Sequence, residues 1–245
     1  ANMLRIAMWS GPRNISTAMM RSWENRVDTC VVDEPLYAHY LRATGIEHPG
    51  TEEILQSQNN DWKRVTEQLT QEQPDPKCSI YYQKHMSHHL LDSIQTDWLL
   101  SLNNCFLIRD PDSVVASYAE KRPNVTPEDL GYTQLLRIYE LVCANQDGKP
   151  PVIDSDLFLQ APKQQLQTLC DRLGINFSER MLHWPPGRRD SDGIWAKYWY
   201  HNVERSHGFM PWQPRELRLS SEQQKISDAC RPIYETLFEH CIKND

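Results

Sequence analysis

The sequence has no long apolar run, no paired cysteines and no signal-peptide pattern. No apolar stretch approaches the roughly 18 residues that a membrane helix needs. The seven cysteines are scattered without a Cys-x-x-Cys pair, which disfavours a disulfide framework or a structural zinc site. Because unpaired cysteines are typical of reducing compartments, the predicted location is the cytoplasm, with no membrane span.

An excess of positive charge is also missing. The 245 residues include 26 basic and 33 acidic side chains, for a net charge of -7. Proteins that bind nucleic acid broadly need a basic face, so no nucleic-acid partner is expected. If the ligand is an anion, its site must gather positive charge locally.

Short apolar runs alternate with helical patterns along the chain. Five runs without clean alternation are predicted to be buried parallel strands: 4–9, 29–32, 79–83, 105–108 and 151–154. The predicted helices are 17–24, 62–72, 88–94, 113–120, 127–145, 163–173 and 221–241. This order predicts one α/β domain over 3–245, in which helices flank a mostly parallel sheet in three layers. Ligands of such sheets bind at the carboxyl ends of the strands.

The segment MWSGPRNISTAM, residues 8–19, joins the first predicted strand to the first helix. ATP-binding loops contain a second glycine followed by a lysine that reaches the terminal phosphates, and this segment has neither. A helix start with free N–H groups still favours an anion, and Arg13, Ser16 and Thr17 add a charge and two hydroxyls. The alternative is a plain strand–turn–helix in which Ser16 only caps the helix.

A second segment, FLIRDPDSVVASY, runs from residue 106 to 118. Arg109 follows a buried strand, and Ser117 lies eight residues later on the next predicted helix. An arginine at a strand end can hold a phosphate in a bidentate manner, and a serine can add a hydrogen bond to the same group. On its own, Arg-Asp-Pro is more typical of a strand exit followed by a capped turn.

Together the two segments resemble the sulfotransferases that use 3′-phosphoadenosine-5′-phosphosulfate (PAPS). In that family, a loop P-[KR]-x-G-[ST]-[ST] binds the 5′-phosphosulfate, and an arginine and a serine separated by seven residues bind the 3′-phosphate. The resemblance implies that PAPS is bound by Gly11, Pro12, Arg13, Asn14, Ile15, Ser16, Thr17, Arg109 and Ser117. Ile15 replaces the family's glycine. Since a β-branched residue resists positive φ, either the loop backbone must differ or the ligand must lie farther out.

The resemblance also implies a fold and a reaction. The fold is the P-loop-like sulfotransferase fold, and the reaction moves a sulfuryl group from PAPS, without a metal, to a hydroxyl or amine of a small or peptide-like acceptor. Arg13 would stabilise the transition state. A non-catalytic nucleotide-binding module and, less favoured, a kinase-like phosphotransferase are the alternatives. The sequence predicts neither the acceptor's identity nor the oligomeric state.

The base that deprotonates the acceptor has two candidates. Glu34 follows the second strand and resembles the catalytic glutamate of tyrosylprotein-type members. His85 follows the third strand and resembles the Lys-x-His segment of cytosolic members, but with spacing one residue short. A shift of one residue turns a strand side chain to the other face of the sheet, which favours Glu34 over His85. Two more histidines, His88 and His89, follow without a carboxylate or cysteine at metal-binding spacing, so no metal is predicted.

The stretch 183–214 is rich in Trp, Pro, Arg and Gly. It is predicted to be a lid or a long ordered loop that contributes to the acceptor site, with one helix at about 196–205. By position it resembles the late basic loop that closes over the nucleotide in cytosolic sulfotransferases. Arg188, Arg189 and Lys197 would then contact PAPS; otherwise this is an ordinary basic surface loop.

Overall fold

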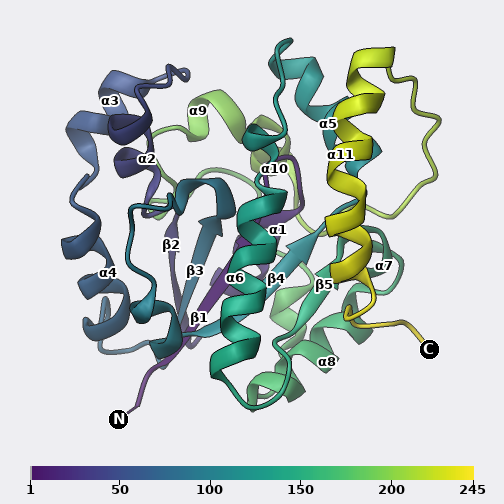
Figure 1. Cartoon of the computed structure of the whole chain (residues 1–245). Coiled ribbons are helices and arrows are strands. Elements are labelled where there is room, and N and C mark those ends of the chain that lie inside the picture. Colours follow the sequence, from purple (N-terminus) through teal and green to yellow (C-terminus); the bar gives the residue numbers. More distant parts are fainter. Residues whose placement is uncertain (1) are drawn as a thin grey trace.

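Five parallel strands form one sheet in the order β2-β3-β1-β4-β5 (Figure 1). The computed structural model describes residues 2–245. The strands are β1 Leu4–Ser10, β2 Thr29–Asp33, β3 Ile80–Met86, β4 Asn103–Ile108 and β5 Val152–Asp154. All neighbouring strands in the sheet pair in parallel, which confirms the predicted sheet. Their carboxyl ends therefore lie along one edge.

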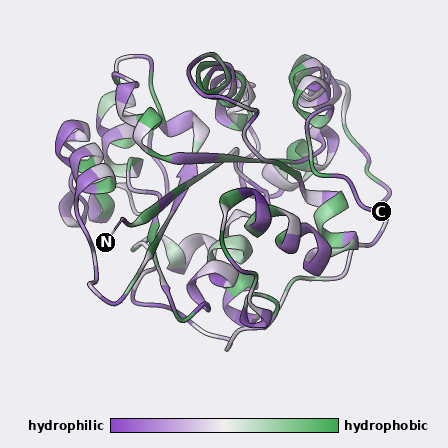
Figure 2. Cartoon of the chain, turned by 90° about the horizontal axis from the view of Figure 1, so that it is seen from below, coloured by the Kyte–Doolittle hydropathy of each residue, from purple (hydrophilic) through white to green (hydrophobic). Residues whose placement is uncertain are grey.

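Helices cover both faces of the sheet and make the predicted three layers (Figure 2). One face packs against α1 (Ser16–Glu24), α7 (Ser155–Gln160) and α8 (Pro162–Leu173). The other packs against α4 (Trp62–Gln71), α5 (Pro111–Lys121), α6 (Tyr132–Asn145) and α11 (Ser221–Phe238). Because successive strand residues point to opposite faces, Met8 packs in the first core and its neighbour Trp9 in the second.

A third cluster joins distant parts of the chain beside β2. It contains α2 (Tyr37–Thr44) and α3 (Thr51–Ser57), together with Trp195 and Tyr200 from the late segment 183–214. That segment forms two short helices, α9 (Ala196–Trp199) and α10 (His201–Arg205), instead of the one predicted. Within residues 2–245, no helix has the length and apolar character that crossing a bilayer requires.

Several predicted boundaries were wrong. Strand β3 continues to Met86 rather than ending at residue 83, and the helix predicted at 88–94 is only the single turn Ser87–His89. The helix predicted at 127–145 is broken at Gly131, which takes a left-handed φ of 70° between the turn Glu128–Leu130 and α6. Helices α2, α3 and α7 were not predicted, because each is short.

Candidate active site

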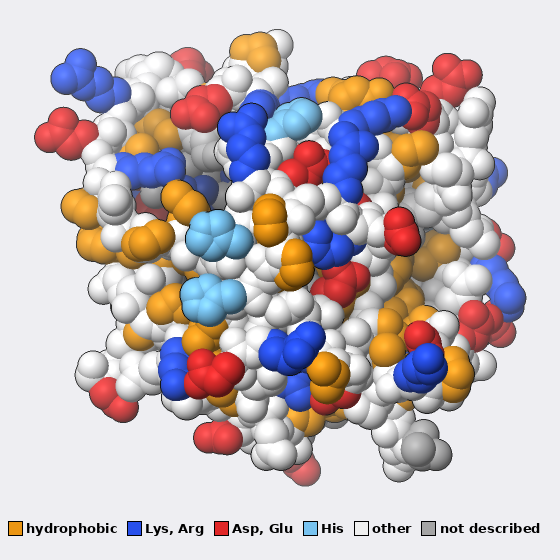
Figure 3. Space-filling view, turned by 180° about the vertical axis from the view of Figure 1, so that it is seen from behind, with side chains coloured by type: hydrophobic (Ala, Val, Ile, Leu, Met, Phe, Trp, Pro, Cys, Tyr) orange, Lys and Arg blue, Asp and Glu red, His pale blue; other side chains and the backbone are white. Residues whose placement is uncertain are grey.

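A cleft of about 340 Å³ opens at the carboxyl ends of the strands. This volume lies within the range of roughly 300–1,000 Å³ that is common for small-molecule sites. Seen from behind, several lysine and arginine side chains lie in the upper part of the molecule, and others are spread over its lower half (Figure 3). The predicted site residues that line the cleft are Pro12, Arg13, Asn14, Ile15, Ser16, Thr17, Glu34, Arg109 and Ser117.

The loop between β1 and α1 takes its positive φ at Arg13, so that Ile15 does not need one. Ile15 keeps an ordinary φ of -82°, while Arg13 takes the left-handed value of 57°. Arg109 holds the turn, because its Nη1 donates to the carbonyl oxygen of Arg13 at 2.5 Å. The loop backbone therefore differs from the family pattern in the place where it turns. Gly11 lies outside the cleft, and a Cβ there would meet the carbonyl oxygen of Leu130 at 2.4 Å.

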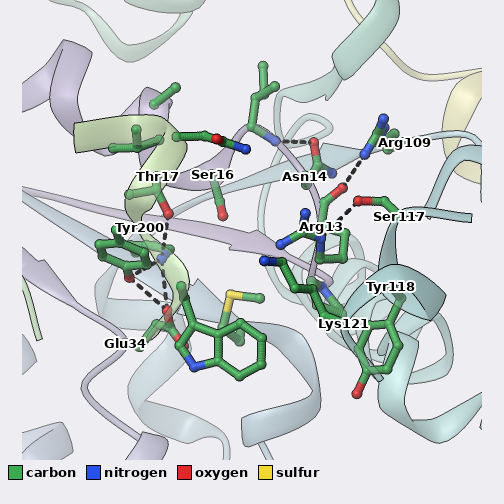
Figure 4. A pocket seen from close by; sticks show the side chains of 18 of the residues that line it. Arg13, Asn14, Ser16, Thr17, Glu34, Arg109, Ser117, Tyr118, Lys121 and Tyr200 are labelled. Carbon is green, nitrogen blue, oxygen red and sulfur yellow. Dashed lines mark hydrogen bonds and ion pairs between the residues drawn. The ribbon is translucent and has the colours of Figure 1, made fainter. Parts of the chain in front are cut away.

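Arg13 and Arg109 form a cationic pair without carboxylate partners (Figure 4). Arg13 Nε donates to Ser117 Oγ at 2.9 Å, and within residues 2–245 neither arginine forms an ion pair. Burial lowers the pKa of Arg109, and the nearby charge of Arg215 adds to that effect. Burial also lowers the pKa of Arg13, with Glu120 opposing. Two half-buried positive charges without carboxylate partners make this side of the cleft suited to an anionic ligand.

The start of α1 adds neutral donors to the same side. Its N-cap residue is Ile15, whose side chain cannot accept a hydrogen bond from the first turn. The first N–H groups of an α-helix have no partner inside the helix and attract anions. Lys121, one turn after Ser117 on α5, also lines the cleft and was missed by the sequence analysis. Its spacing of four residues from Ser117 places both on one helix face and is the signal that could have found it.

A further cation, Lys84 of β3, is held in a network of acceptors, and Figure 4 labels Thr17, Glu34 and Tyr200 of this network. Its Nζ donates to Thr17 Oγ1 at 2.9 Å, to Glu34 Oε2 at 2.8 Å and to the Tyr200 hydroxyl at 2.6 Å. Asp33 lies 3.3 Å from the same Nζ. Glu34 has a left-handed φ of 43°, an uncommon value for a glutamate and one that often marks functional sites.

Burial and the paired charges oppose one another in this network. Burial raises the pKa of Asp33, and the charge of Lys84 offsets only part of that rise. Burial alone would lower the pKa of Lys84, but the two carboxylates outweigh it and the pKa lies above its ordinary value. Burial also raises the pKa of Tyr200, so its hydroxyl keeps its proton. Lys84 is therefore a charged ammonium at neutral pH.

The part of the cleft over β2 and β3 has an aromatic wall. Five aromatic side chains line it, together with Met86: Tyr37, His48, His88, His89 and Trp195. The Tyr37 ring stacks on His89 at 4.6 Å and meets Trp195 edge-on at 5.1 Å. Burial lowers the pKa of His88 to about 4 and that of His89 well below its ordinary value, so both rings are neutral at pH 7.

His85, predicted as a candidate base, does not line the cleft. Because β3 continues through Met86, Lys84 and Met86 face the cleft and His85 points to the opposite core. There it stacks on Trp9 at 4.3 Å, and its Nε2 pairs with Gln83 Oε1 at 3.0 Å. Burial lowers the pKa of His85 to about 3. We therefore withdraw His85 as a candidate base.

The basic residues predicted to close over the nucleotide also lie outside the cleft. Arg188 pairs with Glu204 at 3.0 Å, and Lys197 pairs with Glu53. Arg189 donates to backbone carbonyls of its own loop. The late segment instead lines the cleft with uncharged residues: Trp195, Trp199, Tyr200, Asn202, Val203, Ser206, Gly208, Phe209 and Met210. The ion pair of Arg188 and these hydrogen bonds of Arg189 lie within the late segment itself, whereas Lys197 ties the segment to Glu53 of α3.

A metal site is not apparent in the described chain. Among residues 2–245, no group of three or more His, Cys, Asp or Glu side chains is arranged to hold a metal ion.

Comparisons with known proteins place this geometry in a family. A family model described as a sulfotransferase domain matches residues 4–239. Branched-chain-amino-acid aminotransferase-like protein 1 of Arabidopsis thaliana is 36% identical over 238 residues, which cover 96% of this chain and 42% of the relative. The chain thus spans about two fifths of that relative, whose name describes the longer protein.

Solved structures support the fold. The sulfotransferase domain from the curacin biosynthetic pathway aligns with a TM-score of 0.53 at 13% identity, covering 94% of this chain and 99% of that domain. The sulfotransferase domain of the Synechococcus PCC 7002 olefin synthase aligns with a TM-score of 0.54 at 14% identity, covering 94% and 95%. By the match over residues 4–239, the chain belongs to the sulfotransferase domain family.

Proposed function

We propose that this chain transfers a sulfuryl group from PAPS to a hydroxyl or amine of an acceptor molecule. The observation that carries the proposal is the cationic pair Arg13–Arg109, which has no carboxylate partner within residues 2–245 and lies beside the uncapped start of α1. Half-buried cations without partners are partly desolvated, and an anionic ligand would offset that cost. A nucleotide with phosphate groups at two positions fits two cations held at two strand ends.

The residues in the cleft fit such a donor. Arg13, Ser16 and Thr17 would hold its 5′ end at the start of α1, and Arg109 with Ser117 would hold the 3′-phosphate, in agreement with the family motifs. When bound, PAPS supplies an activated sulfuryl group whose leaving group is a phosphate. The guanidinium of Arg13 would neutralise the charge that develops on that phosphate as the S–O bond breaks.

Glu34 is the proposed base. Its Oε2 is occupied by Lys84 and Tyr200, whereas its Oε1 makes no hydrogen bond within residues 2–245. The proton of the acceptor's O–H or N–H would pass to Oε1 as the acceptor atom bonds to sulfur. Lys84, which contacts both Thr17 of the first loop and Glu34, lies between the donor and acceptor sides and would balance charge on both.

The acceptor would lie over β2 and β3, because the cations that suit the nucleotide lie over β1 and β4. The aromatic wall there, with its neutral histidines, suits a small or peptide-like acceptor with a flat or apolar portion. All seven cysteines are free, which agrees with the proposed location in the cytoplasm.

A turnover assay tests the proposal. The purified chain is incubated with PAPS and pools of phenols, alcohols, amines and short peptides, and PAP release is followed without added metal. We expect PAP release that depends on an acceptor and falls at least tenfold in Arg13→Ala. Binding of PAP without turnover on any pool would favour the non-catalytic nucleotide-binding module. Selective binding of ATP with magnesium would favour the kinase-like alternative.

A further inference from the structure

The Tyr200 hydroxyl lies at the centre of the Lys84 network although Tyr200 comes from the late segment. Its oxygen lies 2.8 Å from both carboxylate oxygens of Asp33 and 3.0 Å from Glu34 Oε2. Lys84 Nζ at 2.6 Å and Trp195 Nε1 at 3.0 Å donate to the same oxygen. Tyr200 is 5% exposed, so water does not compete for these contacts freely.

The Tyr200 hydroxyl has more hydrogen-bond partners than it can satisfy at one time. A phenol has one proton to donate and two lone pairs that accept. Lys84 and Trp195 can only donate here, so they fill the two lone pairs. The single phenol proton must then serve two carboxylates, Asp33 and Glu34, and at any instant it can lie on only one of them. With one ammonium and two carboxylates, the buried cluster also has one negative charge in excess.

The remaining partners fix Asp33 more firmly than Glu34. Asp33 Oδ2 accepts from the backbone N–H of Gly193 at 2.9 Å, and Asp33 does not line the cleft. The other charged or titratable groups near the cluster are Arg21 of α1, Tyr37 and His48, which the charge of Glu34 acts on, and His89. Arg21 is paired with Asp192 at 2.5 Å and acts on Asp33 through its charge, while His89 is acted on by the charge of Lys84.

We propose that Tyr200 is a positioning residue that shares its one hydroxyl proton between Asp33 and Glu34, so that Glu34 stays unprotonated until the acceptor arrives. This role rests on the proposed function, in which Glu34 is the base. In the resting state the phenol proton alternates between Asp33 and Glu34, and Lys84 contacts both carboxylates. When Glu34 takes the acceptor's proton, the total charge of the cluster rises from -1 to zero, and Tyr200 with Asp33 stabilises the new arrangement.

The first experiment does not depend on activity. The carboxyl carbons of Asp and Glu are labelled with ¹³C, and Asp33 is titrated by NMR in the wild-type chain, Tyr200→Phe and Tyr198→Phe. Loss of a hydrogen bond to a carboxylate disfavours its charged form, so the Asp33 midpoint should rise by about one pH unit in Tyr200→Phe. Tyr198→Phe is the matched control, because Tyr198 also anchors the late segment, through a 3.0 Å hydrogen bond to Glu53 outside the cleft, and should leave the midpoint unchanged.

The second experiment uses the pH dependence of turnover. Tyr200→Phe should lower kcat about tenfold, move the acidic limb of the profile to higher pH, and leave the KM for PAPS within about twofold. Asp33→Asn should move the same limb in the opposite direction, because it removes a negative charge beside Glu34. A residue that only packs would change stability or KM, without opposite shifts in the two variants.

Two results would overturn the role of Tyr200. One is an Asp33 midpoint that is the same in Tyr200→Phe as in the wild-type chain. The other is a shift of equal size in Tyr198→Phe, which would mean that anchoring of the late segment is responsible. Absence of PAP binding by the wild-type chain would contradict the proposed function instead, and the NMR titration would still decide whether Tyr200 bridges the two carboxylates.

Discussion

The two sides of the cleft treat their cations in opposite ways. Arg13 and Arg109 have no carboxylate partner within residues 2–245, whereas Lys84 contacts two carboxylates, Asp33 and Glu34. A cation without a carboxylate partner attracts an anionic ligand, but it has no nearby carboxylate whose protonation it can influence. A cation paired with carboxylates attracts a further anion less strongly, but its charge affects how readily those carboxylates take up or release a proton. In the proposed function, this difference assigns donor binding to the β1–β4 side and proton transfer to the β2–β3 side.

Proton transfer on the β2–β3 side is expected to depend on the carboxylate of one residue, Glu34. Glu34→Gln keeps the size of the side chain but removes the carboxylate that accepts the proton. We expect turnover to fall at least about 10³-fold, in line with the loss of a well-placed general base, while PAP still binds. Turnover is measured by PAP release, and PAP binding by calorimetry. Glu53→Gln, which lies outside the cleft on the late segment's partner helix α3, is the control and should keep turnover near that of the wild-type chain.

On the β1–β4 side, substitutions are expected to lower turnover less than Glu34→Gln does, and the size of the effect should depend on whether the positive charge is kept. Arg13→Ala should lower kcat about 10²-fold, because it removes a preorganised cation from the leaving phosphate. Arg13→Lys should recover part of this, since a lysine keeps the charge but not the hydrogen bond from Nε to Ser117. Single-turnover kinetics separate this from binding. A weaker affinity for PAPS at unchanged kcat would mean that Arg13 only binds.

Arg188→Ala tests whether a cation of the late segment that already has a carboxylate partner contributes to PAPS binding. Arg188 is exposed and paired with Glu204, and it does not line the cleft. Its loss should change kcat/KM for PAPS by less than about twofold, since exposed ion pairs contribute little. A change of tenfold or more would show that the late segment moves Arg188 onto the nucleotide.

The smallest effect is expected behind the sheet. His85→Asn removes the ring that stacks on Trp9, one residue from Lys84 but on the opposite face. It should cost about 1–2 kcal/mol of stability and lower Tm by roughly 2–8 °C, with kcat near that of the wild-type chain. Thermal unfolding and turnover are measured on the same preparation. A stable but inactive His85→Asn would return His85 to the list of bases.

The sequence predicted the sheet, the anion side of the cleft and Glu34, because each lies next to a strand in the chain. Local patterns can reveal such residues directly: Arg109 and Ser117 are only eight residues apart in the chain. Tyr200 could not be found in this way, since it reaches Asp33 over a separation of 167 residues. The end of β3 was also misjudged, because Lys84 and His85 are polar and buried, and a polar pair usually marks the end of a strand.

The three basic residues of the late segment were misjudged for a related reason. Composition records that Arg188, Arg189 and Lys197 are charged, but not that Glu204, Glu53 and nearby carbonyl groups already occupy them. Only the folded structure shows which cations are free to meet a ligand.

Calorimetric titration of PAP and AMP without divalent metal tests most directly whether the uncompensated cations bind a 3′-phosphate. Two charge-assisted hydrogen bonds from Arg109 are expected to make PAP bind about 10²-fold more tightly than AMP. Saturation at 100 times the dissociation constant should stabilise the fold by about 2.7 kcal/mol. Arg109→Ala should remove most of the preference for PAP and leave AMP binding nearly unchanged. Equal affinities for PAP and AMP in the wild-type chain, or equal losses for both ligands in Arg109→Ala, would contradict this assignment.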